Sequence, residues 1–108
     1  MTAAPGDTRA ALVRVWVVSD LEGIVLDASA HAKEVFRVTR RGLIGRNLYT
    51  FFDAERPMIM QCADVAASEQ PVALAGWLRP RDAKPVSIHF TIQRESRALV
   101  PSLLWNFR

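Results

Sequence analysis

Residues 17–52, VVSDLEGIVLDASAHAKEVFRVTRRGLIGRNLYTFF, determine how the rest of the chain is interpreted. Their opening apolar run is followed by Asp20-Leu21-Glu22-Gly23, in which glycine supplies the positive φ that a tight turn needs. We therefore expect a hairpin whose second strand runs over residues 24–28. Ser29 is expected to cap the next helix, because its hydroxyl can accept a hydrogen bond from an amide of the first turn.

Two short helical segments are predicted after the hairpin. Each has apolar residues at i, i+3 and i+4, which places them on one face: Ala32, Val35 and Phe36 in the first, and Leu48, Phe51 and Phe52 in the second. Residues 39–42 separate the first helix from the Leu43-Ile44-Gly45 segment that leads to the second.

The longest helix is expected to start near residues 54–57, because Pro57 is tolerated only in a first helical turn. It should end between Ser68 and Pro71. Its predicted inward stripe consists of Met58, Cys62, Val65 and Ala66.

Strands are predicted on both sides of this helical region. Residues 11–19 form the first, with Val13, Val15 and Val17 on one face and Leu12, Arg14, Trp16 and Val18 on the other. Three more are expected over residues 72–80, 85–94 and 98–107, the last with Leu99, Leu103, Trp105 and Phe107 in phase and with Pro101 at a bulge or an edge. This order predicts an α+β fold, an antiparallel five-stranded sheet flanked by short helices and one longer helix.

Size and composition indicate one domain. The chain has 108 residues, of which 50% are apolar, enough for a core of its own. We expect a single domain over residues 11–108 and a flexible flank over residues 1–10. The single cysteine, Cys62, cannot form an internal disulfide, which favours a reducing, cytoplasmic setting. No stretch approaches the roughly 20 apolar residues of a membrane span.

The net charge of +3 raises the question of nucleic-acid binding. The basic residues are scattered, and their densest group has no interleaved aromatic residues: Arg37, Arg40, Arg41 and Arg46. A solvated basic face is the favoured interpretation, and no nucleic-acid partner is expected.

Three segments together resemble the PAS domain, a sensor and interaction module of signalling proteins. SDLEGIVLDAS, residues 19–29, is similar to the family's D-x-x-G-x-I hairpin, with Val25 in the last place and Ser29 where Asn is common. Residues 42–52, GLIGRNLYTFF, resemble its Leu-Ile-Gly segment, and residues 79–92, RPRDAKPVSIHFTI, resemble its polar turn and alternating strand. The resemblance covers nearly all of residues 12–108.

The resemblance implies a sheet that folds around the short helices and encloses an apolar cavity, which holds a ligand in some members and is filled by side chains in others. The residues expected to line it are Phe36, Leu48, Phe51, Phe52, Met58, Cys62, Ile88, Phe90 and Trp105. Such domains commonly dimerise through the outer sheet face, where we expect Trp16, Trp77 and Leu104. The chain ends where the last strand of the family would end, so an output domain further along a longer parent protein is expected.

Haem and flavin are disfavoured as cofactors. Haem-binding relatives place a histidine on the long helix, and residues 54–69 contain none, which leaves Met58 or Met60 as alternative ligands. Photoactive flavin relatives need a reactive cysteine before that helix, where this chain has GRNLYTFF. Cys62 lies within the helix and is interpreted as a small buried hydrophobic residue. The cofactor, if any, stays unnamed.

No catalytic pattern is present. His31 is expected on a helix surface and His89 on the polar face of its strand, and no P-loop, HExxH, CxxC pair or GxSxG occurs. Catalytic and metal-binding residues are therefore predicted to be absent. The leading hypothesis is a non-enzymatic sensory domain that couples a small apolar ligand or a partner to an output module, as a homodimer. The alternatives are a ligand-free dimerisation module and, more weakly, a haem or redox sensor.

Overall fold

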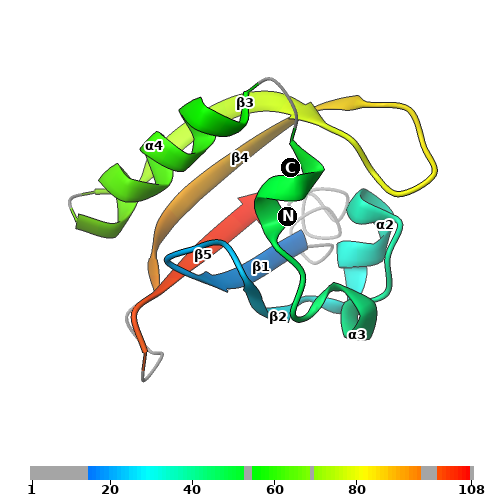
Figure 1. Cartoon of the computed structure of the whole chain (residues 1–108), viewed down its shortest axis with the longest axis horizontal. Coiled ribbons are helices and arrows are strands. Elements are labelled where there is room, and N and C mark those ends of the chain that lie inside the picture. Colours follow the sequence, from blue (N-terminus) through cyan, green and yellow to red (C-terminus); the bar gives the residue numbers. More distant parts are fainter. Residues whose placement is uncertain (1–14, 53–54, 69, 96–99, 108) are drawn as a thin grey trace, which may run out of the picture.

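In the computed structural model, which describes residues 15–52, 55–68, 70–95 and 100–107, five strands form one antiparallel sheet (Figure 1). The order across the sheet is β2-β1-β5-β4-β3, so the last strand lies in the centre between the first and the fourth. The bounds are β1 Val15–Asp20, β2 Val25–Ala28, β3 Val72–Leu78, β4 Val86–Glu95 and β5 Ser102–Phe107. The predicted α+β class with a five-stranded antiparallel sheet is confirmed.

Four short helical segments and one longer helix join the strands. They are the 3-10 helix η1 (Ala30–Ala32), α2 (Lys33–Phe36), α3 (Arg40–Leu43), the 3-10 helix η2 (Leu48–Phe51) and α4 (Arg56–Ser68). In Figure 1 the short helices lie beside β1 and β2, whereas α4 runs along the other half of the sheet. Buried residues of these segments and of one sheet face form a single hydrophobic core.

The β1–β2 turn is fixed by backbone and side-chain bonds. The amide of Gly23 donates to the carbonyl of Asp20 at 3.1 Å, and one carboxylate oxygen of Asp20 accepts from the amides of Glu22 and Ile24, each at 2.9 Å. Gly23 has a φ of +94°, as predicted for the turn glycine. Its carbonyl accepts from the amide of Leu48 at 2.7 Å, so the turn is also tied to η2.

Ser29 does not cap the helix that follows it. Its hydroxyl accepts from the amide of Trp16 at 3.1 Å, and its own amide donates to the carbonyl of Trp16 at 2.9 Å. The predicted cap is therefore wrong, because the hydroxyl instead extends the pairing between β2 and β1. Capping is found further on, where Thr39 accepts from Gly42 at 3.1 Å and Asn47 accepts from Tyr49 at 2.9 Å.

The bounds of α4 match the prediction, and its predicted inward stripe is right in part, since Ala66 is buried and Cys62 packs half-buried against the core. Ile59, Ala63 and Ala66 are the buried residues, whereas Met58 is 44% exposed and Val65 37%. The buried face is therefore rotated by less than the roughly 100° of one residue step, with Ile59 and Ala63 in place of Met58 and Val65. Both stripes are apolar, and docking on the sheet selects the one with small alanines, which allow a close approach.

The strand phases follow the alternation of the sequence. On β1, Val17 and Ser19 are buried, and Trp16 and Val18 lie on the other face and are half-buried. Pro101 lies just before β5 rather than at a bulge or an edge, and β5 is the central strand. The strands β3 and β5 are shorter than predicted. The expected flank, residues 1–10, and the predicted strand positions Leu12, Val13, Arg14 and Leu99 lie outside the described residues.

Candidate functional site

An aromatic cluster joins the helical layer to the sheet. Phe90 on β4 has its ring centroid 5.5 Å from that of Phe52, 6.0 Å from that of Trp105 and 5.3 Å from that of Phe107. Phe36 on α2 lies edge-on to Phe51 at 5.0 Å and to Phe107 at 5.1 Å. These six rings, called the aromatic core below, contact one another from α2, η2, β4 and β5.

Most of the residues predicted to line a ligand cavity are brought together in this core region. The buried ones are Phe36, Leu48, Phe51, Phe52, Ile88, Phe90 and Trp105. Cys62 is half-buried and packs against the core, and Met58 lies on the exposed side of α4, so its assignment to the interior is wrong. Whether the buried set surrounds a ligand stays a prediction.

Two polar side chains lie within this apolar region. The indole Nε1 of Trp105 donates to the hydroxyl of Ser19 at 2.8 Å, and that hydroxyl donates to the carbonyl of Asp20 at 2.9 Å. Both Ser19 and Trp105 are fully buried. The indole N–H is therefore satisfied by the protein itself, as a buried donor requires.

Tyr49 is a core residue that the sequence patterns did not select. Its ring lies edge-on to Trp105, with centroids 5.8 Å apart. Burial raises the pKa of its phenol to about 12, and the negative charges of Asp64 and Asp20 add to the shift. The phenol is therefore neutral at physiological pH. The contact that places it in the core is with Gly23, where a Cβ would lie 2.5 Å from the Tyr49 ring.

The three residues predicted for the outer sheet face lie in two separate places. Trp16 and Leu104 are half-buried on the neighbouring strands β1 and β5, where Val18 is the direct partner of Leu104. Trp77 lies on the edge strand β3 and is 58% exposed. The outer face thus has one apolar group near its centre and one exposed indole at its edge.

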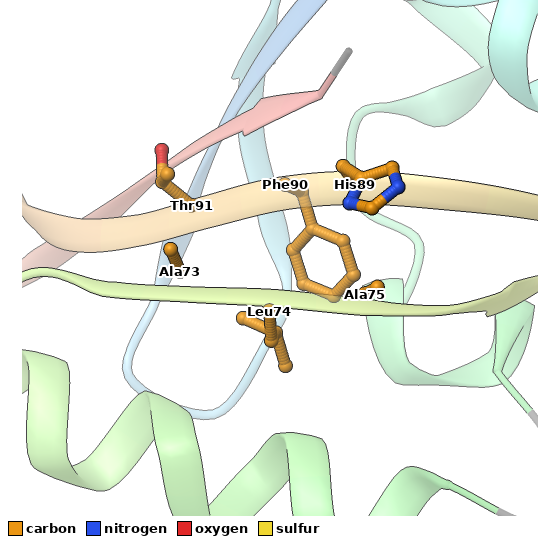
Figure 2. A pocket seen from close by; sticks show the side chains of 6 residues that line it. All are labelled: Ala73, Leu74, Ala75, His89, Phe90 and Thr91. Atoms are coloured by element: carbon orange, nitrogen blue, oxygen red, sulfur yellow. The ribbon is translucent and has the colours of Figure 1, made fainter.

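A hollow of about 310 Å³ lies between β3 and β4 and is lined by Ala73, Leu74, Ala75, His89, Phe90 and Thr91. Figure 2 shows His89 and Thr91 on one side of β4, while Leu74 points to the opposite side, toward a helix. Ala73 is the register partner of Thr91, and Ala75 is that of His89. The outer side of the hollow is therefore made by two alanines, a threonine and the exposed His89.

The charged residues of the helical layer make local contacts. His31 lies 3.0 Å from Glu34 at an exposed site. Arg40 pairs with Asp27 and donates to the carbonyl of Ala28 at 2.7 Å, which ties α3 to β2. The other members of the predicted basic face are exposed, namely Arg37, Arg41 and Arg46.

The described ranges contain neither a metal-binding cluster nor a membrane-spanning helix. There, no three His, Cys, Asp or Glu side chains lie close enough together to bind a metal ion. No helix in the same part of the chain has the length and apolar character needed to cross a bilayer.

The similarity of the chain to known proteins lies in its structure. No family model matches the chain, and none of the curated proteins matches it. Among solved structures, it is similar to the PAS domain of an HTR-like protein from Haloarcula marismortui, with a TM-score of 0.73 and 17% identity over 95% of this chain and 97% of the other. It is also similar to the PAS-B domain of Drosophila melanogaster Cycle with bound ethylene glycol, with a TM-score of 0.76 and 12% identity over 87% of this chain and 97% of the other.

A third structure is the PAS domain of the Cronobacter turicensis RpfR quorum-sensing receptor in complex with C12:0. Its TM-score is 0.67, with 16% identity over 87% of this chain and 90% of the other. Identities this low establish a likeness of architecture, and the element order and the sheet topology agree with it. The chain has the PAS fold.

Proposed function

We propose that this PAS domain is a sensory domain of a signal-transduction protein, in which a small apolar ligand bound beside the aromatic core controls an output module. The observation that carries the proposal is the ring-to-ring contact between the helical layer and the sheet. Phe36 of α2 contacts Phe107 of β5, and Phe52, which follows η2, contacts Phe90 of β4. A molecule inserted between these layers changes how the short helices pack on the sheet.

The chemistry of the interior favours a ligand that is mostly hydrocarbon. The described core consists of aliphatic and aromatic side chains with few polar groups, as in apolar ligand sites. The indole N–H of Trp105 is already bonded to Ser19, so it offers no free donor. The RpfR domain, which shares this fold, is in complex with C12:0. We therefore propose an aliphatic chain as the ligand class.

Signal transmission would follow from a shift between two packings. A ligand that binds one packing of α2 and η2 more tightly raises the population of that packing. The coupling reaches the sheet through the aromatic core, and the sheet carries it to its outer face and to the ends of the chain. The proposed domain is non-enzymatic, cytoplasmic and part of a longer protein with an output domain.

A ligand-free dimerisation module is the second function considered. It is supported by the direct contacts among the six rings, which fill part of the interior without a ligand. Its proposed interface is the apolar group of Trp16, Val18 and Leu104 on the outer face. A haem or redox sensor is less well supported, because Met58 and Met60 are 44% and 45% exposed and lie away from the core.

Native and denaturing mass spectrometry of the purified protein, together with its absorption spectrum, distinguish these functions. A native species heavier than the protein alone, which returns to the protein mass on denaturation, supports a bound ligand. A colourless dimer with the mass of two chains and nothing else supports the ligand-free dimerisation module. Dodecanoic acid is then added as the probe. Binding should be lost in Ile88→Phe, which adds volume to the buried side of β4, and kept in Val86→Phe, an exposed position of the same strand.

Circular dichroism of both variants checks that they remain folded. Equal binding of the probe by folded Ile88→Phe and by the control would contradict a site beside the aromatic core. Sedimentation velocity of Trp16→Glu tests the dimer separately. A monomeric wild type at high concentration, or unchanged assembly of the variant, would contradict the proposed interface.

A further inference from the structure

Tyr49 carries a buried hydroxyl for which the described residues provide no hydrogen-bond partner. The residue is 4% exposed. Its backbone is bonded, since its amide donates to the Asn47 side chain at 2.9 Å and its carbonyl accepts from the amide of Phe52 at 3.0 Å. The phenol oxygen makes no hydrogen bond with any residue in the described ranges. A hydroxyl buried without a partner destabilises a folded protein, so its presence in the core calls for an explanation.

The other buried hydroxyls in the described part of the chain are used by the protein itself. They belong to Ser19, Ser29 and Ser102. Each makes at least one hydrogen bond with another residue, at distances between 2.8 and 3.1 Å. Within these ranges, the Tyr49 hydroxyl is therefore the buried one that remains free to bind a molecule other than the protein.

The Tyr49 ring lies at one end of the aromatic core. It is edge-on to Trp105, with centroids 5.8 Å apart, and Trp105 in turn stacks on Phe90 at 6.0 Å. One edge of the Tyr49 ring lies against the β1–β2 turn, where a Cβ on Gly23 would be 2.5 Å from Cδ2 and Cε2. The ring is thus held in place by β5 and the turn. A ligand that lies along the aromatic core reaches Tyr49 at the Trp105 end.

The charges near the hydroxyl determine which polar group it can bind. Asp64 on α4 and Asp20 in the turn both raise the pKa of the phenol, so both contribute negative potential at its oxygen. The Asp20 carboxylate is fixed there, because one of its oxygens accepts from the amides of Glu22 and Ile24. A potential that disfavours the phenolate also disfavours a carboxylate placed beside it. An uncharged oxygen can accept from the phenol O–H without this cost.

We propose that the Tyr49 hydroxyl binds the polar end of the ligand, and that this end is an uncharged oxygen group, a hydroxyl or a carbonyl, on an aliphatic chain. The inference rests on the sensory function proposed above and adds to it a binding residue and an end group. The ligand supplies the hydrogen-bond partner that the protein lacks, and the two carboxylates select against the anion of a fatty acid.

Two probes with the same chain length, 1-decanol and decanoic acid, test the end group. Calorimetry near neutral pH, where the acid is ionised, should show 1-decanol binding about tenfold more tightly. Tyr49→Phe should weaken 1-decanol binding about tenfold, the equivalent of one hydrogen bond, and change decanoic acid binding less than about twofold. Thr50→Val, which removes an exposed hydroxyl from the next residue, is the control and should leave both affinities unchanged.

The stability of the ligand-free protein gives a readout that separates binding from a structural role. Because the hydroxyl has no partner in the described ranges, Tyr49→Phe should leave the thermal midpoint unchanged or raise it. Removal of a hydroxyl that is bonded within the protein would lower the midpoint. Weaker 1-decanol binding without a lower midpoint is therefore the expected result.

Asp64→Asn tests the selection by charge. It removes the larger of the two charge effects, so it should tighten decanoic acid binding several-fold and leave 1-decanol binding unchanged. No change in the affinity for decanoic acid would contradict the proposed selection.

The remaining outcomes separate this inference from the sensory function. Equal affinity of the wild type and Tyr49→Phe for 1-decanol would overturn the proposal and assign the hydroxyl to bound water. Wild-type binding of decanoic acid as tight as that of 1-decanol would overturn the uncharged end group. In both cases a ligand still binds, and the sensory function stands. Binding of neither probe would count against the sensory function and against this inference together.

Discussion

The indole of Trp105 donates a hydrogen bond to the hydroxyl of Ser19 at 2.8 Å, joining two fully buried residues that are 86 positions apart in the sequence. The bond lies between the adjacent strands β5 and β1, on the face that the helices cover. We expect Ser19→Ala to lower the free energy of unfolding by about 1–3 kcal/mol, because it leaves a buried N–H without an acceptor. Urea denaturation measures this change.

Ser87→Ala is the matched control, since Ser87 is exposed on β4. It should change stability by no more than about 0.5 kcal/mol. Equal stability of the two variants would mean that the Trp105–Ser19 bond makes no net contribution to folding.

Gly23 and Gly45 distinguish two reasons why a position requires glycine, namely a positive φ and a lack of space for a Cβ atom. Both have positive φ, +94° and +93°, but a Cβ at Gly23 would lie 2.5 Å from the Tyr49 ring, whereas one at Gly45 would have no neighbour within 4 Å. Gly45→Ala should cost about 1 kcal/mol of backbone strain, since positive φ is disfavoured for alanine. Gly23→Ala should cost clearly more, because the Tyr49 ring must also move. Thermal unfolding of both variants compares them, and a similar loss in both would contradict the steric contribution.

Local patterns predicted those parts of the fold that depend on neighbouring residues. The Asp-x-x-Gly turn, the helical turn over residues 48–51 and the alternation of β4 each have a cause within a few residues, and each is found in the structure. The resemblance in these segments also identified the fold class. The interior positions of Phe36, Phe52 and Phe90 followed from the same spacing.

Features that depend on tertiary contacts could not be predicted in this way. The hydroxyl of Ser29 could accept a hydrogen bond either from an amide of the following helix or from an amide of a neighbouring strand. The approach of Trp16 on β1 determines that it accepts from the Trp16 amide. Tyr49 belongs to the core because Gly23 allows the turn to lie against its ring. The sequence alone does not show that these segments meet.

The rotation of α4 is the clearest case and gives a prediction. Met58 and Ile59 are adjacent apolar residues, and only docking on the sheet shows that Ile59 is the fully buried one. We expect Ile59→Ala to cost about 2–5 kcal/mol through loss of buried surface and creation of a cavity. Met58→Ala should change stability by about 0.5 kcal/mol or less. Urea denaturation of the pair tests the phase, and the reverse order would restore the stripe predicted from the sequence.

Tyr49 is the only tyrosine of the chain, so its ionisation can be followed directly by ultraviolet absorbance. Its pKa is raised from 10.0 to about 12 in the folded protein, because burial and the charges of Asp64 and Asp20 disfavour the phenolate. The folded state therefore holds the phenolic proton more tightly than the unfolded state does. The resulting stabilisation is complete below pH 10 and is lost as the pH rises toward 12.

In a titration with base, phenolate absorbance should develop near pH 12 in the folded protein and near pH 10 in urea. Asp64→Asn, which removes the larger of the two charge effects, should lower the folded midpoint while leaving the midpoint in urea unchanged. Thr50→Val, an uncharged change beside Tyr49 on the exposed side of η2, is the control and should leave both midpoints in place. If the phenolate titrated at the same pH in the folded and the unfolded wild type, the phenol would have to be hydrated in the folded state. The close packing of the Tyr49 ring against Gly23 would then not extend to its hydroxyl.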